Sequence, residues 1–461
     1  MKPPAPARMF NPEFRGRIGV ARRDMTPPVG IHSRTWGSAL HDVADAVHRP
    51  FVATCLALGD VKGDNELFLI TLDALVFWPL AADRIRSSVE RQFGLKPEQV
   101  IFHPSHSHSA PFLNARHLDQ PGGHLIGPYL EKMPTLCCEL VADARMSMAP
   151  ATLSWGYGRC GLAFNRDALD PPTGRDICGL NLMDAADDTV LVGRAADDQG
   201  RIVATLVNYA CHPVSLGGGN RTLSPDYIGS MREIIERDTG GAPCLFLHGA
   251  SGDLTPRRSY EPDVEAADQN GRELGYAALS TLASLFPPGQ HLEYQGIEES
   301  GTALGRWRLR ARKPADTTIA ARTVTTKLRV RSMPTRREIE AKLAVTTERY
   351  EIERLERALG RRAQVGDEDW ASFPFTIWRL GEAFIVSTPA EPYSQFQMEL
   401  RKQFPEAAIA VLNLSDGTTT YLPRPSAFER DVYQSRIALY EPGALDLVTG
   451  AASRAIIDMA R

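Results

Sequence analysis

The histidines of this chain are few and unevenly placed. There are 11 in 461 residues, yet His103, His106 and His108 lie within six positions, in the stretch IFHPSHSHSAPF at 101–112. In an extended segment, residues two apart point to the same face, so His106 and His108 can approach one ion or one substrate. A hydrogen-bonded polar loop also uses such residues, and the pair alone does not distinguish the two interpretations.

Three other places share this arrangement, in which an apolar strand stops and polar residues follow at once. His212 follows LVNYAC, Glu391 follows FIVSTPA, and Tyr421 follows VLNLSDGTTT. In α/β folds, sites form beyond strand ends, where loops converge over the sheet. Catalytic zinc is held by two or three neutral nitrogens and a carboxylate, with one position left open. Each residue alone is typical of a packed or solvated position, but together they supply the ligand types of such a site, without thiolates.

The composition excludes several classes of protein. A net charge of −4 and a pI near 6.3 argue against a nucleic-acid partner. No run of 18 apolar residues occurs, so no transmembrane segment is expected. The stretch MKPPAPARMFNPEFRGR at 1–17 lacks the apolar core of a signal peptide, and the seven cysteines form no Cys-x-x-Cys pair. We therefore expect a cytoplasmic protein with free thiols.

Strand and helix patterns alternate along the chain, which predicts an α/β fold with a layered mixed β-sheet core and flanking helices. The strands that deliver the polar residues are expected at 98–104, 189–213, 375–391 and 407–415. We expect an N-terminal tail at 1–17, a core formed by 18–290 with 371–461, and an appended smaller α+β subdomain at 291–370. This subdomain should hold antiparallel strands and a long helix over 335–362, charged on most faces.

Several motifs together resemble a known family. SHSHSAP, at 105–111, resembles the Thr-His-Thr-His-Ser-Gly-Pro signature of the neutral/alkaline (non-lysosomal) ceramidases. Further pieces follow in the family's order: GVARRDMTPPVG, AFNRD, NYACHPVSL, LSPDYIG, GASGDLTPRR, TPAEPYSQF and TYLPRPSAFERDVYQS. The resemblance covers most of residues 18–440 and is weakest across 291–370. It corresponds to the N-terminal catalytic domain of that family.

The resemblance implies an amidohydrolase with one zinc ion per chain. By motif position the metal ligands would be His106, His212, Glu391 and Tyr421. His108 and Arg166 match residues that contact the scissile amide and the substrate hydroxyls, and Tyr433 matches another substrate-contacting tyrosine. A zinc-activated water would attack the amide carbonyl. His108 and Tyr421 would then steady the oxyanion, and Glu391 would carry the proton.

The departures from the family bear on the substrate. Ala110 stands where the family has glycine, Thr255 stands where it has serine, and its immunoglobulin-like C-terminal domain has no counterpart. We therefore expect a small-molecule or lipid-like N-acyl amide that is smaller or more soluble than ceramide. A zinc-dependent esterase on the same scaffold and a non-catalytic ligand-binding homologue are the alternatives. The sequence also leaves a homo-oligomer possible.

Overall fold

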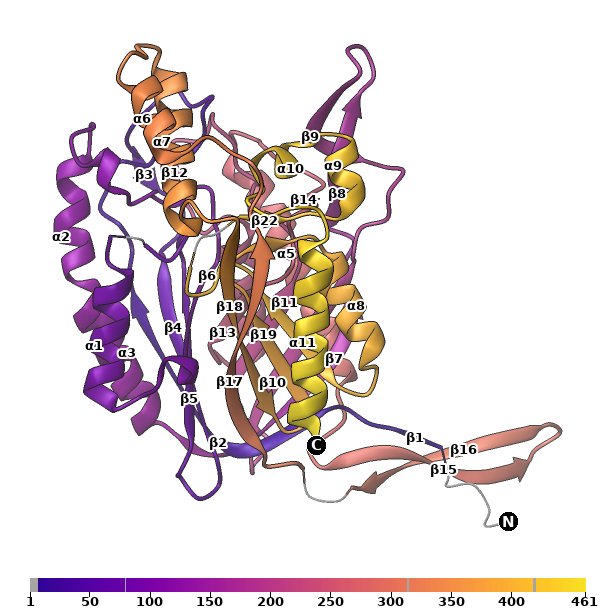
Figure 1. The fold of residues 1–461 in the computed structure, drawn as a ribbon. Coiled ribbons are helices and arrows are strands. Elements are labelled where there is room, and N and C mark those ends of the chain that lie inside the picture. Colours follow the sequence, from indigo (N-terminus) through magenta and orange to yellow (C-terminus); the bar gives the residue numbers. More distant parts are fainter. Residues whose placement is uncertain (1–6, 79, 313–314, 418–419) are drawn as a thin grey trace.

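Two β-sheets lie face to face in this protein, and helices cover both outer faces (Figure 1). The computed structural model describes residues 7–78, 80–312, 315–417 and 420–461, so residues 1–6 of the expected tail lie outside the described part. The predicted class, an α/β fold with a layered mixed-sheet core and flanking helices, is confirmed.

The larger sheet has eight strands within the described residues. In sheet order they are β13 (Cys244–His248), β11 (Ile202–Tyr209), β10 (Thr189–Asp197), β7 (Ala149–Arg159), β2 (Glu13–Asp24), β4 (Val52–Gly59), β5 (Glu66–Leu72) and β6 (Val100–Pro104). The two edge pairs, β11–β13 and β5–β6, are parallel. The edges also approach each other, because the backbone N–H of His248 in β13 donates to His103 Nε2 in β6 at 2.8 Å. This curvature brings the ends of β6 and β11 together.

The smaller sheet has the order β17 (Ile319–Arg329), β18 (Trp370–Leu380), β19 (Ala383–Ser387) and β21 (Ala408–Leu412). The strands β19 and β21 are parallel, so both point their carboxyl ends the same way. Leu206 and Leu245 of the larger sheet belong to one buried cluster with Trp378 and Ile385 of the smaller one. Burial of these alternating apolar faces holds the sheets together.

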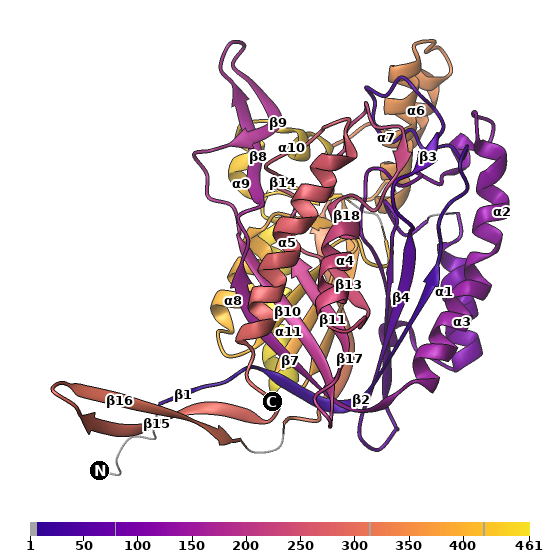
Figure 2. The ribbon, with the colours of Figure 1, turned by 180° about the vertical axis from the view of Figure 1, so that it is seen from behind.

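Helices cover the outer faces of both sheets (Figures 1 and 2). They are α1 (Ala82–Phe93) and α3 (Met133–Met146) over β4 and β5, α4 (Tyr227–Asp238) and α5 (Val264–Ser284) over β10, β11 and β13, and α8 (Gln395–Gln403) and α11 (Ala444–Ala460) on the smaller sheet. No helix in the described parts of the chain combines the length and apolarity needed to cross a membrane.

The single helix predicted over 335–362 is wrong, because the structure has two. Helix α6 (Arg336–Leu343) begins with a capping box in which Thr335 and Glu338 bond reciprocally, and α7 (Arg349–Val365) follows after a break. The break contains Thr346 and Thr347, and such residues compete with a helix for backbone hydrogen bonds. Thr346 Oγ1 donates to the carbonyl oxygen of Lys342 at 2.7 Å, which ends the first helix.

The segment 291–370 contributes two different structures. Strands β15 (Gln290–Glu299) and β16 (Ala303–Ala311) form a hairpin that projects from the body together with β1 (Arg8–Met9) (Figure 1). Strand β17 instead pairs with β18 along eleven positions of the smaller sheet. The division of the chain into a core and an appended subdomain stays a prediction.

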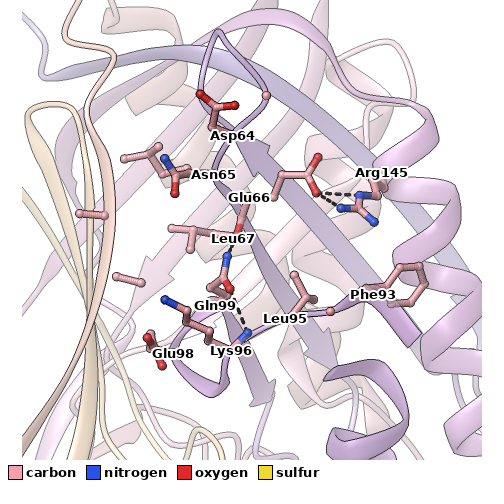
Figure 3. A pocket seen from close by; sticks show the side chains of 15 residues that line it. Asp64, Asn65, Glu66, Leu67, Phe93, Leu95, Lys96, Glu98, Gln99 and Arg145 are labelled. Carbon is pink, nitrogen blue, oxygen red and sulfur yellow. Dashed lines mark hydrogen bonds and ion pairs between the residues drawn. The ribbon is translucent and has the colours of Figure 1, made fainter. Parts of the chain in front are cut away.

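A hollow of about 400 Å³ lies where β5 and β6 begin, at the opposite end of these strands from the histidines. Some of its polar groups have partners (Figure 3): Glu66 Oε2 lies 2.5 Å from Arg145 Nη2, and Gln99 Nε2 donates to the Glu66 carbonyl oxygen at 2.9 Å. None of the residues that the sequence predicts for the site lines this hollow.

Candidate metal centre

The four predicted strand ends converge at one end of the two sheets, the upper end in Figure 1. His106 follows β6, His212 follows β11, and Glu391 follows β19. Glu391 lies in the short strand β20 (Glu391–Pro392), which pairs in parallel with β22 (Tyr421–Leu422), so that Glu391 and Tyr421 are register partners. All four side chains are buried.

Five functional atoms meet at this point. His106 Nε2 lies 3.1 Å from His212 Nε2, and Glu391 Oε2 lies 3.2 Å from His212 Nε2 and 3.5 Å from His106 Nε2. His108 Nε2 lies 3.4 Å from His106 Nε2. Tyr421 Oη lies 3.5 Å from His212 Nε2. His106, His212 and Glu391 therefore form a closed triangle, and His108 and Tyr421 each reach one corner of it.

The hydrogen bonds behind the rings fix which nitrogen is free. His106 Nδ1 lies 2.7 Å from the carbonyl oxygen of Leu75, and His212 Nδ1 lies 3.1 Å from that of Ser251. Because a carbonyl oxygen only accepts, each Nδ1 must donate a proton, and in a neutral ring this leaves a lone pair on Nε2. Histidine ligands of metals are typically oriented by such a bond from the other nitrogen.

The backbone at His106 is adapted to this task. Its φ is +65°, in the left-handed region that non-glycine residues rarely adopt. The strained conformation is held because the His106 N–H donates to the carbonyl oxygen of Ala74 at 2.8 Å. Strain of this kind costs about 1–3 kcal/mol and collects at functional sites.

The donor set fits a divalent cation. Three acceptor atoms face one another, namely His106 Nε2, His212 Nε2 and Glu391 Oε2. The carboxylate oxygen is buried and accepts no hydrogen bond within the described residues. A proton could satisfy one pair of these atoms, whereas a cation between them satisfies all three. Ligands about 2.0–2.1 Å from zinc in a tetrahedron lie about 3.3 Å apart, close to the observed spacings. The imidazoles of His106, His108 and His212, whose ligand atoms lie within 4.8 Å of one another, could hold a metal ion.

The local electrostatics keep these groups in metal-binding form. Burial lowers the pKa of His212 to about 3, and burial likewise lowers the pKa of His108 well below its usual range, so both rings are neutral at pH 7. Burial raises the pKa of Tyr421 well above its usual range, so Tyr421 remains a phenol that can donate.

The predicted substrate residues line one cavity beside the triangle. The cavity measures about 1110 Å³, and Arg166, Tyr433, His108, His212 and Tyr421 are all on its wall. Arg166, in β8 (Ala163–Asp170), donates from Nε and Nη2 to the carbonyl oxygen of Gly252 at 3.1 and 2.7 Å, and its guanidinium lies 5.4 Å from the Tyr421 ring centre. The Tyr433 ring centre, in α10 (Tyr433–Ile437), is 6.1 Å from that of Tyr421.

His103 is separated from the other two histidines of its cluster. It is fully buried in β6, where Nδ1 lies 2.9 Å from Ser415 Oγ and Nε2 accepts from the backbone N–H of His248 at 2.8 Å. It therefore ties the edges of the curved sheet together rather than facing the cavity.

A His103→Leu variant is expected to lose about 1–3 kcal/mol of unfolding free energy at pH 7, because the His248 N–H is left without its acceptor. Burial lowers the folded-state pKa of His103 to about 3, from an ordinary value of 6.5. The stability it contributes is therefore present above pH 6.5 and is lost as the pH falls toward 3. Urea unfolding at pH 7 and pH 4 should show the difference between the two proteins shrinking at pH 4. A constant difference would contradict the buried neutral assignment.

Two residues of the centre were missed from the sequence. The His248 ring stacks on that of His106 with centres 5.4 Å apart, and Ser251 Oγ lies 2.6 Å from His248 Nε2 and 3.2 Å from His212 Nδ1. His248 ends the buried strand β13 and Ser251 follows it, in the stretch FLHGASGD. The only available signal was another strand ending in polar residues, the same signal that marked the four ligand-type positions.

No protein-family model matches the chain, and no curated protein matches it by sequence. Among solved structures, neutral ceramidase from Pseudomonas aeruginosa superimposes with a TM-score of 0.67 at 16% identity, covering 98% of this chain and 74% of that one. A ceramidase complexed with C2 gives a TM-score of 0.66 at 14% identity, covering 98% and 75%. This chain has the ceramidase fold. The resemblance read from the motifs is thus confirmed for the fold, and the ceramidase fold extends through 291–370, where those motifs were weakest.

Proposed function

We propose that this protein is a zinc-dependent amidohydrolase that cleaves an N-acyl amide bond. The observation that carries the proposal is the closed triangle of His106, His212 and Glu391, whose three acceptor atoms lie 3.1–3.5 Å apart. One proton could satisfy only one pair of these atoms, whereas one cation satisfies all three. The ceramidase fold supports the same reaction class, because the two solved structures are described as ceramidases. Tyr421 would complete the ligand set.

A bound zinc ion supplies Lewis acidity and a water whose pKa is lowered to about 7. The residues of this chain do the remaining work. His108 and the Tyr421 phenol face the cavity beside the triangle, where each can donate a hydrogen bond to the oxygen of the amide carbonyl as it becomes negative. Glu391 is the nearest carboxylate to receive a proton from water and return it to the leaving amine.

Substrate orientation falls to Arg166 and Tyr433. Arg166 is held rigidly because two of its nitrogens share the Gly252 carbonyl oxygen, and its guanidinium lies over the Tyr421 ring. Tyr433 is about half exposed and lines the same cavity. Together they can hold the polar part of a substrate while the carbonyl lies against His108 and Tyr421.

We further propose that the substrate is smaller or more soluble than ceramide. The cavity wall carries many charged side chains, including Arg34, Arg116 and Glu353, which poorly suit two long alkyl chains. Ala110, at the family's glycine position, is completely buried in the core and does not line the cavity.

The test is a comparison of kcat/KM between short-chain N-acyl amines and long-chain ceramide presented in detergent. We expect the best short-chain amide to equal or exceed ceramide. A preference for ceramide of tenfold or more, about 1.4 kcal/mol in the transition state, would overturn the substrate proposal and leave the reaction class intact.

Matched esters belong in the same screen, because ester and amide hydrolysis share a tetrahedral intermediate. Turnover of esters with none of any amide would replace the proposal with the esterase alternative. No turnover of either, with zinc bound, would favour a non-catalytic binding protein.

A further inference from the structure

The cavity beside the metal centre has a strongly cationic wall. Eight arginines and two glutamates line it, an excess of six positive charges. The arginines are Arg34, Arg116, Arg166, Arg349, Arg354, Arg357, Arg361 and Arg436. Half of them come from one helix, α7, which stands over the upper end of the sheets (Figure 1). The whole chain has a net charge of −4, so this concentration is local.

Several of these arginines are already neutralised by protein carboxylates. Arg349 Nη2 lies 2.7 Å from Asp42 Oδ1, and Arg349 Nε lies 3.2 Å from Glu353 Oε1. Arg354 Nη2 lies 2.8 Å from Glu351 Oε2 on the same helix. These pairs brace α7 and leave little charge to offer a ligand.

Arg357 and Arg361 differ from their neighbours. Both are half-buried on the cavity side of α7, one helical turn apart, so their guanidinium groups lie on one face. Within the described residues neither has a hydrogen-bond or ion-pair partner. Burial lowers the pKa of Arg361, and the charges of Arg357 and Arg354 lower it further, although Tyr433 opposes them. Two like charges held together out of bulk water are costly unless an anion joins them.

Glu356 is the cavity's second glutamate, and its charge does not remove this excess. It acts on Arg116, raising the pKa of that arginine against the effects of burial and Arg357. Arg116 Nε already bonds to His117 Nε2 at 3.0 Å, and its guanidinium lies over the Phe112 ring. The pair formed by Arg357 and Arg361 therefore keeps two charges for a ligand that enters the cavity.

We propose that Arg357 and Arg361 bind an anionic group of the substrate, which makes the substrate an N-acyl amide carrying a carboxylate, sulfonate or phosphate. This inference rests on the proposed amidohydrolase function and specifies its substrate. Tyr433 is close to both the arginine pair and the metal centre. Its ring is 6.1 Å from that of Tyr421, and it is close enough to Arg361 to raise the pKa of that arginine. Arg357 and Arg361 also line the same cavity as His212 and Tyr421, so a substrate held on α7 occupies the cavity beside the metal centre. A neutral lipid such as ceramide offers these arginines nothing.

The experiment measures hydrolysis by the zinc-loaded enzyme of a panel of amides that share one acyl group and differ in the amine. Hexanoyl amides of glycine, β-alanine and 4-aminobutyrate carry a carboxylate at three distances from the amide, and those of propylamine and ethylenediamine supply neutral and cationic matches. We expect the best carboxylate to exceed the propylamide in kcat/KM about 10- to 100-fold, roughly the range for one charge-assisted hydrogen bond. The ethylenediamine amide should be the poorest.

The double variant Arg357→Gln/Arg361→Gln is expected to reduce the anionic-to-neutral ratio of kcat/KM by about 10- to 100-fold, mainly through KM. Arg337→Gln is the matched control, because Arg337 is exposed on α6 and does not line the cavity. A carboxylate that bound the zinc instead would keep its advantage in the double variant, and that outcome would overturn the proposal.

Calorimetric binding of hexanoylglycine to the metal-depleted protein, which is expected not to cleave it, gives a second reading that needs no turnover. We expect weaker binding by the double variant than by the Arg337→Gln protein. Equal binding by the two would overturn the anion site. If amides are hydrolysed but carboxylates have no advantage, the anion proposal fails and the amidohydrolase proposal stands. If hexanoylglycine binds through the arginines and no amide is cleaved, the anion proposal stands and the amidohydrolase proposal fails.

Discussion

Replacement of His212 by alanine is expected to remove the tightly held divalent ion and to abolish most amide hydrolysis while the fold stays intact. His212 is 1% exposed, and its Nε2 forms two of the three edges of the triangle with His106 and Glu391. Loss of a group that merely supports a metal ligand costs about 10- to 100-fold in affinity, so loss of the ligand itself should exceed about 100-fold. His106→Ala should behave in the same way.

The measurement is metal content per chain after equilibration with zinc and extensive dialysis, with near-ultraviolet circular dichroism as the check on folding. His124→Ala is the matched control, because His124 is exposed and lies in a short turn before α2 (Ile126–Glu131), outside the cavity. Full zinc occupancy in both the His106→Ala and His212→Ala proteins would contradict the assignment of these residues as ligands.

His108→Ala is expected to keep its metal but to lose about 100- to 1000-fold in kcat, the usual effect of removing one oxyanion donor. The triangle of His106, His212 and Glu391 closes without His108, whose Nε2 lies 3.4 Å from His106 Nε2 at one corner. Its ring also packs 5.1 Å from Trp36 on the cavity wall, so it is held in position on the substrate side.

Metal content and steady-state kinetics on the same preparation decide between the two roles of His108. The three histidines alone could hold an ion, so this variant discriminates directly. If His108→Ala strips the zinc as fully as His106→Ala does, His108 is a ligand and Tyr421 or Glu391 loses that role.

The sequence indicated these residues because the signal was local. Each ligand-type residue follows an apolar strand, and strand ends can be found from hydrophobic patterning alone. The convergence of four such ends depends on sheet order and curvature, which no local pattern contains. Only the ceramidase-like motifs placed His106, His212 and Glu391 in one centre before the structure did.

The remaining features depend on tertiary contacts that a sequence pattern does not record. His103 and His106 look equivalent in IFHPSHSH, yet one ties β6 to β13 and the other adopts a φ of +65° to face Glu391. The segment 335–362 is predicted to form one helix charged on most faces, but its second part is a separate helix, α7, on which Arg357 and Arg361 line a cavity. The cytoplasmic location and a homo-oligomer stay predictions from the sequence.

The central claim is that one zinc ion in the triangle drives amide hydrolysis, and its most direct test is a zinc titration of metal-depleted protein. Amidase activity and bound zinc are measured together at each addition. We predict that metal-depleted protein is inactive and that activity rises in proportion to bound zinc, with a break at one equivalent per chain. Undiminished hydrolysis by the metal-depleted protein, or one bound equivalent of zinc that restores no activity, would contradict the account.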